Sequence, residues 1–102
     1  MTTQLKKGII EICVLKVISQ KDMYGFEIIE LLNDKLQTNE NTIYPLLRRL
    51  TKQNLLENYE KKSNTGAPRK YYRITSKGVE TLQNYLVEWE TFIKEVNKIL
   101  EE

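Results

Sequence analysis

The first strongly patterned stretch of the chain runs from Leu5 to Ser19 and is apolar around nearly its whole circumference when drawn as a helix. A helix that is apolar on all sides must be buried on more than one side. Because 102 residues offer only a modest core, two interpretations remain open. Either a second subunit covers one side of this helix, or the helix lies at the centre of a monomer.

Two further helices are predicted, separated by a short polar break. Met23 to Leu36 carries apolar residues on one face, and Gly25 in its first turn weakens an isolated helix but permits close packing. The second runs from about Glu40 to Gln53, with Asn39 as its predicted N-cap. Pro45 removes one backbone hydrogen bond and favours a late start or a kink, yet the apolar pattern continues through it. We therefore predict a helix-turn-helix.

A hairpin and a long helix complete the chain. Leu55 to Lys62 and Arg69 to Thr75 are predicted strands, joined by a segment rich in turn residues. In the second strand, Tyr72 and Ile74 share one face, opposite Tyr71 and Arg73.

Thr75 can cap a final helix that runs to about Leu100. Apolar residues alternate at spacings of three and four along it, which is typical of a coiled-coil seam. These residues are Val79, Leu82, Leu86, Trp89, Ile93, Val96 and Leu100. At 1.5 Å per residue the helix spans roughly 37 Å, too long to bury its seam within one small domain.

The order of elements predicts an α+β fold, mainly α: a winged helix-turn-helix with a long C-terminal dimerisation helix. Residues 1–75 would form the winged-helix DNA-binding domain and residues 76–102 the dimerisation helix. The predicted dimer interface consists of Ile9, Ile12, Leu82, Leu86, Trp89, Ile93 and Val96.

The net charge of +2 does not by itself indicate a nucleic-acid partner, but the distribution of charge along the chain is more informative. Residues 40–75 contain eight Lys or Arg and three acids, a net charge of +5, whereas residues 76–102 carry −3. Such asymmetry fits a phosphate-facing surface or, alternatively, a solvated basic hairpin.

Residue types limit the chemistry that is open to the chain. It has no histidine, which is the commonest general base and metal ligand, and Cys13 is its one cysteine. Cys13 lies in an apolar run, where a cysteine usually acts as a small hydrophobe. We expect no catalytic site, no metal and no cofactor. No apolar run is long enough to span a membrane and no signal peptide is evident, so we expect a cytoplasmic protein.

The second helix of a helix-turn-helix typically enters the major groove of DNA by its N-terminal part. Here that part carries hydrogen-bonding residues, and the hairpin adds cations that suit phosphates. The predicted DNA-binding residues are Asn39, Asn41, Thr42, Tyr44, Arg48, Lys61, Lys62, Arg69 and Lys70. For the helix alone, a merely solvated polar face is the favoured interpretation; the helix together with the basic hairpin favours DNA.

Three stretches resemble the PadR family of bacterial transcriptional regulators: Met23–Ile28 at the start of the second helix, Thr42–Leu50 with its proline, and Gly66–Thr75 followed by Gly78. The resemblance implies a winged-helix dimer, held by the last helix packing on the first helix of its partner, that represses promoters. It also implies DNA contacts by Thr42, Tyr44, Arg48, Arg69 and Lys70. Ala67 departs from the family pattern, in which many members carry a polar residue there.

The final helix is short for the family, which indicates the compact subgroup. Some compact members bind planar aromatic drugs at the dimer centre, stacked on a tryptophan that matches Trp89. A tryptophan on an apolar seam is also explained by simple interface packing. The leading hypothesis is thus a homodimeric repressor of a double-stranded palindromic operator, with a planar aromatic effector as a further hypothesis. The alternative is a winged-helix protein-interaction module.

Overall fold

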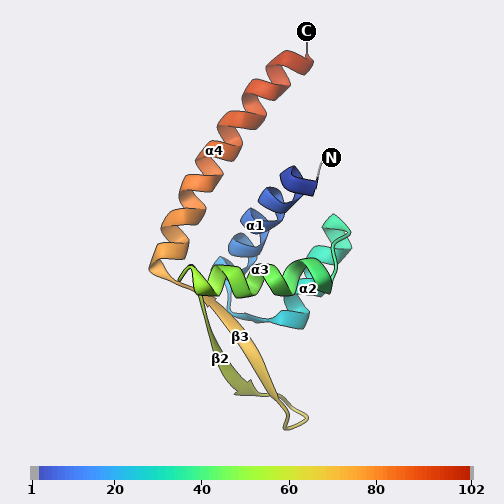
Figure 1. Ribbon diagram of the computed structural model, residues 1–102, viewed down its shortest axis with the longest axis vertical. Coiled ribbons are helices and arrows are strands. Elements are labelled where there is room, and N and C mark those ends of the chain that lie inside the picture. Colours follow the sequence, from blue (N-terminus) through green and yellow to red (C-terminus); the bar gives the residue numbers. More distant parts are fainter. Residues whose placement is uncertain (1–2, 102) are drawn as a thin grey trace.

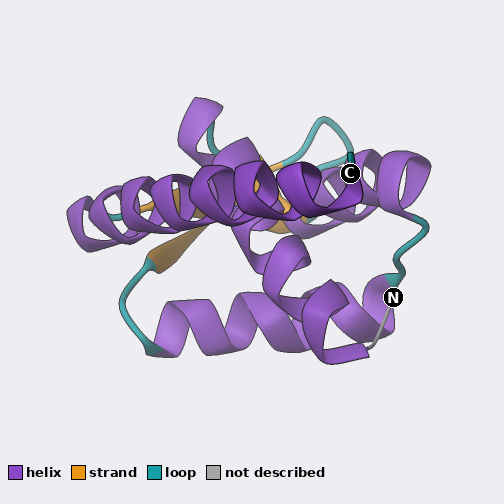
Figure 2. Cartoon of the chain, turned by 90° about the horizontal axis from the view of Figure 1, so that it is seen from above, coloured by secondary structure: helices purple, strands orange, loops and turns teal. Residues whose placement is uncertain are grey.

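The computed structural model describes the backbone of residues 3–101 and the side chains of residues 8–101. Figure 1 shows the hairpin projecting from the helical body in one direction and the last helix, which begins beside the base of the hairpin, extending in the opposite direction. Figure 2, seen from above, shows that helices make up most of the chain. The elements are α1 (Thr3–Gln20), β1 (Met23–Tyr24), α2 (Gly25–Leu36), α3 (Glu40–Lys52), β2 (Leu56–Lys62), β3 (Pro68–Ile74) and α4 (Ser76–Leu100).

The mainly helical α+β fold class is confirmed, with a small antiparallel sheet of order β1-β3-β2. The core gathers around α1, on which Val14, Leu15 and Ile18 are almost completely buried. The other apolar side of α1, at Ile12 and Val17, is only half-buried within one chain. Burial of apolar surface is the main favourable term in folding, so α1 is the element on which the others assemble.

The helix-turn-helix forms as predicted from α2 and α3. The Asn39 side chain accepts a hydrogen bond from the backbone N–H of Asn41 at 2.9 Å, which confirms the predicted N-cap. The helix continues through Pro45, because the buried face of α3 on the other side holds it in place. That face consists of Ile43, Leu46, Leu47 and Leu50.

The predicted start of the second helix at Met23 is wrong. Met23 and Tyr24 form the short strand β1, paired with Tyr72 and Tyr71 of β3, and α2 begins at Gly25. The backbone N–H of Tyr24 donates to the Glu27 carboxylate at 3.1 Å. The pairing partner comes from a distant part of the chain, which helical periodicity does not reveal.

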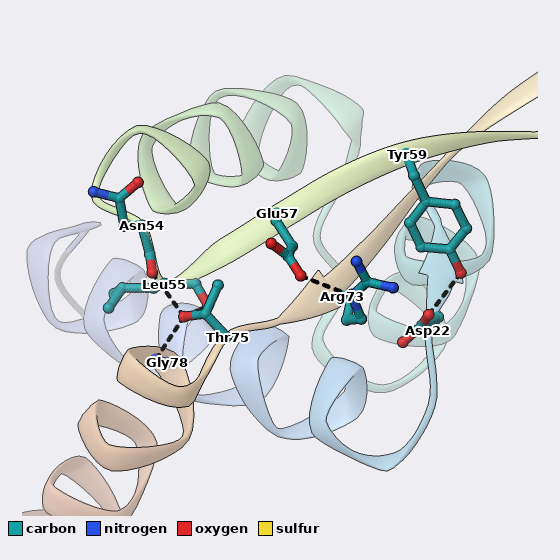
Figure 3. A network of polar contacts seen from close by, with 8 residues as sticks. All are labelled: Asp22, Asn54, Leu55, Glu57, Tyr59, Arg73, Thr75 and Gly78. Carbon is teal, nitrogen blue, oxygen red and sulfur yellow. Dashed lines mark hydrogen bonds and ion pairs between the residues drawn. The ribbon is translucent and has the colours of Figure 1, made fainter.

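The hairpin has the predicted faces. Tyr72 is buried and Ile74 half-buried towards the helices, whereas Arg73 is exposed on the other face. Two polar contacts on that outer face join the hairpin to itself and to the body of the domain. The Arg73 guanidinium donates to Glu57 at 2.8 Å, and the hydroxyl of Tyr59 donates to Asp22 at 2.6 Å (Figure 3).

The junction between the hairpin and α4 is closely built. The Thr75 hydroxyl accepts from the backbone N–H of Gly78 at 2.9 Å, which confirms the predicted cap, and donates to the carbonyl of Asn54 at 2.7 Å (Figure 3). Leu82, predicted at the dimer interface, is 4% exposed within the single chain. It lies in the core of its own subunit, because the first turns of α4 pack against α1. Further along, residues 83–101 of α4 and its C-cap are all at least partly exposed.

Candidate nucleic-acid interface

The exposed face of α3 lies opposite its buried apolar stripe. Successive residues of a helix are rotated by about 100°, so Asn41 and Arg48 fall near the middle of this face and both are exposed. Tyr44 lies at the edge towards the hairpin, with 39% of its surface exposed. Thr42 lies at the opposite edge, half-buried beside a small hollow next to α1. The predicted contact residues of α3 therefore spread over the whole outer face.

A concavity of about 610 Å³ lies where α3 meets β3 and the start of α2. It brings together Tyr44 and Arg48 of α3 with Arg69 and Lys70 of β3, four of the residues predicted from the sequence. Cations from two elements thus border one hollow, and a phosphate group is attracted by such an arrangement. The hollow is lined by Tyr24, Phe26, Tyr44, Arg48, Arg69, Lys70 and Tyr72.

Phe26 was missed by sequence reasoning, although it is 54% exposed at the first turn of α2. A large apolar residue at a helix start is an ambiguous signal, since most such residues pack inward. Tyr24 and Tyr72 line the same concavity, and burial raises the pKa of the Tyr72 hydroxyl, which therefore remains protonated.

Aromatic rings hold the cations of the hairpin in place. The Arg69 guanidinium lies over the Tyr24 ring at 4.5 Å, and the Lys61 ammonium lies 5.5 Å from the centre of the Tyr71 ring. Tyr71 also stacks on Tyr59, with ring centres 5.7 Å apart. Cation–π contacts restrict the side chain without neutralising its charge. Arg69 and Lys61 are therefore restrained by aromatic rings while both remain charged.

Lys61 and Lys62 lie apart from the concavity. Both are exposed on β2, and in the register of the hairpin they face Arg69 and Pro68 across the strands. The structure thus divides the predicted wing residues into a pair beside α3 and a pair on the far strand. Gly66, at the tip between them, has a φ of 88°, which only glycine adopts freely.

A third hollow of about 500 Å³, the apolar groove, lies between α1, α2 and α4. Four residues predicted at the dimer interface line it: Ile9, Ile12, Leu86 and Trp89. Ile93 and Val96 lie further along α4 and are half-buried. The exposed large apolar residues of α4 are Val79, Val87, Phe92, Ile99 and Leu100.

Residues 3–101 contain no helix that is long and apolar enough to cross a membrane. Among the same described residues, no cluster of three or more potential metal ligands occurs.

Comparison with known proteins connects this geometry to a family. The model of the transcriptional regulator PadR-like family matches residues 14–84. A PadR-like transcriptional regulator from Bacillus cereus is 40% identical, with 98% of this chain and 99% of that chain covered and a TM-score of 0.89. A Streptococcus transcriptional regulator is 35% identical, with coverage of 96% and 98% and a TM-score of 0.88.

An uncharacterized protein of Lysinibacillus sphaericus is 37% identical over 87 residues, which cover 81% of this chain and 80% of that protein. The family model spans α2, α3 and both hairpin strands, and it includes every residue that lines the concavity. Its members are transcriptional regulators that bind DNA, rather than enzymes. The chain belongs to the PadR-like family of transcriptional regulators.

Proposed function

We propose that this regulator is a cytoplasmic homodimeric repressor that binds a palindromic operator through α3 and the hairpin. Residues 1–75 would bind DNA and residues 76–102 would hold the dimer together. The observation that carries the proposal is the concavity in which Tyr44 and Arg48 of α3 meet Arg69 and Lys70 of β3. Elements far apart in the chain here present one cationic surface with hydrogen-bonding groups.

The positions of the residues indicate which of them would contact bases and which would contact phosphates. Asn41 and Arg48, in the middle of the exposed face of α3, can reach base edges in the major groove. Arg69 and Lys70 lie beside α3 and can bind the adjacent phosphates, with Lys61 and Lys62 further out on the wing. Asn39, whose side chain caps α3, would place the helix N-terminus near a phosphate.

The dimer would form through the C-terminal part of α4 and the apolar groove. Beyond Leu82, α4 carries apolar residues that one chain leaves at least partly exposed, among them Trp89 and Phe92. A contiguous apolar surface of this kind is typical of an interface with another protein chain. A two-fold dimer presents two copies of α3, which matches an operator with half-sites one helical turn apart.

The test is a footprint and binding titration on the promoter region of the regulator's own gene. Arg48→Ala should weaken specific binding by about 1–3 kcal/mol, whereas Lys70→Ala should weaken binding to all sequences and lower the salt slope by about one. Lys94→Ala, an exposed lysine of α4, is the matched control and should leave both quantities unchanged. Binding that is weak and blind to sequence, or untouched by Arg69→Ala with Lys70→Ala, would favour the alternative of a protein-interaction module.

A second candidate function is control by a planar aromatic effector, which the apolar groove favours. Trp89 lines this groove together with Cys13 and Leu86, and Lys16 and Lys35 line it as well. Because Trp89 is the single tryptophan, its fluorescence reports on this position alone.

Planar cationic dyes are the probes, and stacking should quench the emission of Trp89 and lower operator affinity at the same dye concentration. The Trp89→Phe variant, a smaller ring at the same place, should bind dye less tightly. Emission that stays constant across the titration would leave Trp89 as a packing residue.

A further inference from the structure

Glu11 of α1 is contacted by two other helices at once. Its Oε2 accepts a hydrogen bond from Arg49 Nη2 of α3 at 3.2 Å, and its Oε1 lies 3.5 Å from the hydroxyl of Tyr85 on α4. Only 13% of the Glu11 side chain is exposed. A carboxylate withdrawn from water in this way is less screened by salt than a surface pair.

The partner on α3 is the direct neighbour of a predicted DNA-binding residue. A rotation of about 100° between successive residues turns Arg48 towards the concavity beside the hairpin and Arg49 towards α1. Throughout residues 8–101, whose side chains are described, the Arg49–Glu11 pair is the one side-chain hydrogen bond that joins α1 to α3. This pair is therefore a direct polar link between α1 and α3, in addition to their packing in the shared apolar core.

The partner on α4 extends the link to the long helix. Burial, and then the Glu11 carboxylate, raise the pKa of the Tyr85 hydroxyl, which therefore remains a hydrogen-bond donor at neutral pH. Tyr85 precedes Leu86 and Trp89, which line the apolar groove. The Glu11 carboxylate thus contacts both α3 and the part of α4 that leads into the apolar groove.

We propose that Glu11 is a positioning residue, through which the helices that hold the dimer set the angle of the DNA-reading helix. This inference rests on the proposed function. It goes beyond that function by assigning a role to Glu11, Arg49 and Tyr85, to none of which the proposed function gives a DNA contact. A rigid link between α3 and the dimer helices makes the dimer sensitive to the spacing of the two half-sites, because each recognition helix is then fixed relative to its twin.

The experiment measures the affinity of the full-length dimer for its operator and for an operator with one base pair inserted between the half-sites. The variants are Glu11→Gln, Arg49→Gln and the double variant. The control is Lys21→Gln, which breaks the exposed ion pair with Glu27 at the start of α2. Melting temperature and solution mass are followed alongside, and Arg49, about half-exposed, provides a variant that folds if Glu11→Gln does not.

Each single variant should bind the operator with native half-site spacing about fivefold more weakly than the wild type does. The double variant should lose no more affinity than either single variant. The penalty for the inserted base pair should shrink in all three, whereas Lys21→Gln should behave as the wild type does. A loss in Arg49→Gln with none in Glu11→Gln would show that Arg49 touches DNA itself and would overturn the proposal. An unchanged spacing penalty would overturn it too. A wild-type protein that selects no operator would refute the proposed function and this inference together.

Discussion

A single methyl group added at Gly78 should destabilise the fold, although it lies in a helix. An ideal Cβ built on Gly78 would come 2.1 Å from the carbonyl oxygen of Leu55 and 2.7 Å from Cγ1 of Ile74. The backbone atom cannot swing aside as a side chain does. The same carbonyl accepts hydrogen bonds from the backbone N–H and the hydroxyl of Thr75, both at 3.1 Å, so moving it disturbs the cap of α4 (Figure 3).

The expected magnitude follows from three terms. Forcing an extra methyl into a packed site costs about 1–3 kcal/mol, and weakening the Thr75 cap costs about 1 kcal/mol. Replacing glycine by alanine within a helix stabilises the helix by about 1 kcal/mol. We therefore expect Gly78→Ala to lower the free energy of unfolding by about 2 kcal/mol, which corresponds to a fall in melting temperature of about 10 °C for a domain of this size.

Gly8→Ala is the matched control, because a Cβ on Gly8 of α1 would meet nothing within 4 Å. That variant should gain about 0.5–1 kcal/mol from helix propensity alone. Both variants are compared with the wild type by urea denaturation at one fixed protein concentration, since the proposed dimerisation would make apparent stability depend on concentration. Equal stabilisation by the two substitutions would refute the reasoning from close packing at Gly78.

Three more predictions use other contacts. Thr75→Val keeps the shape of the side chain but loses the cap, and should lower the free energy of unfolding by about 1 kcal/mol in urea titrations; no change would contradict the assigned cap. The hydrogen bond to Asp22 raises the pKa of Tyr59 in the folded state. The bond therefore stabilises the fold fully below the pKa that Tyr59 has in the unfolded chain, and this stabilisation is lost as pH rises through the pKa in the folded state. Tyr59→Phe should accordingly show a shallower loss of melting temperature above about pH 10, and an identical slope would speak against the bond. Gly25→Ala places a Cβ 2.9 Å from the Tyr44 ring; it should weaken operator binding while stability changes by less than about 1 kcal/mol, and unchanged affinity would remove Tyr44 from the interface.

Local pattern was sufficient for most elements. Spacings of three and four placed α3 and α4, and the polar residues Asn39 and Thr75 marked where these helices begin, because a cap acts over only three residues. Alternation in β3 predicted which face is buried. The motif resemblance, which needs no coordinates, indicated the family that the comparisons then showed.

The contacts between distant residues could not be predicted in this way. The strand at Met23 and Tyr24 exists because β3 supplies its partner, and Leu82 belongs to the core because α4 starts against α1. Neither fact has a local signature, since pairing and burial depend on which elements meet.

In the candidate site, too, some features follow from the sequence and others depend on contacts between distant residues. Sequence reasoning by itself determined that α3 carries polar residues outward and that the hairpin is basic, since both follow from residue type and period. Only the tertiary structure decided that Arg48 faces the concavity with Arg69, while its neighbour Arg49 is held by Glu11 of α1. Adjacent arginines are chemically identical, and what distinguishes them is the direction in which packing of the whole helix turns each one.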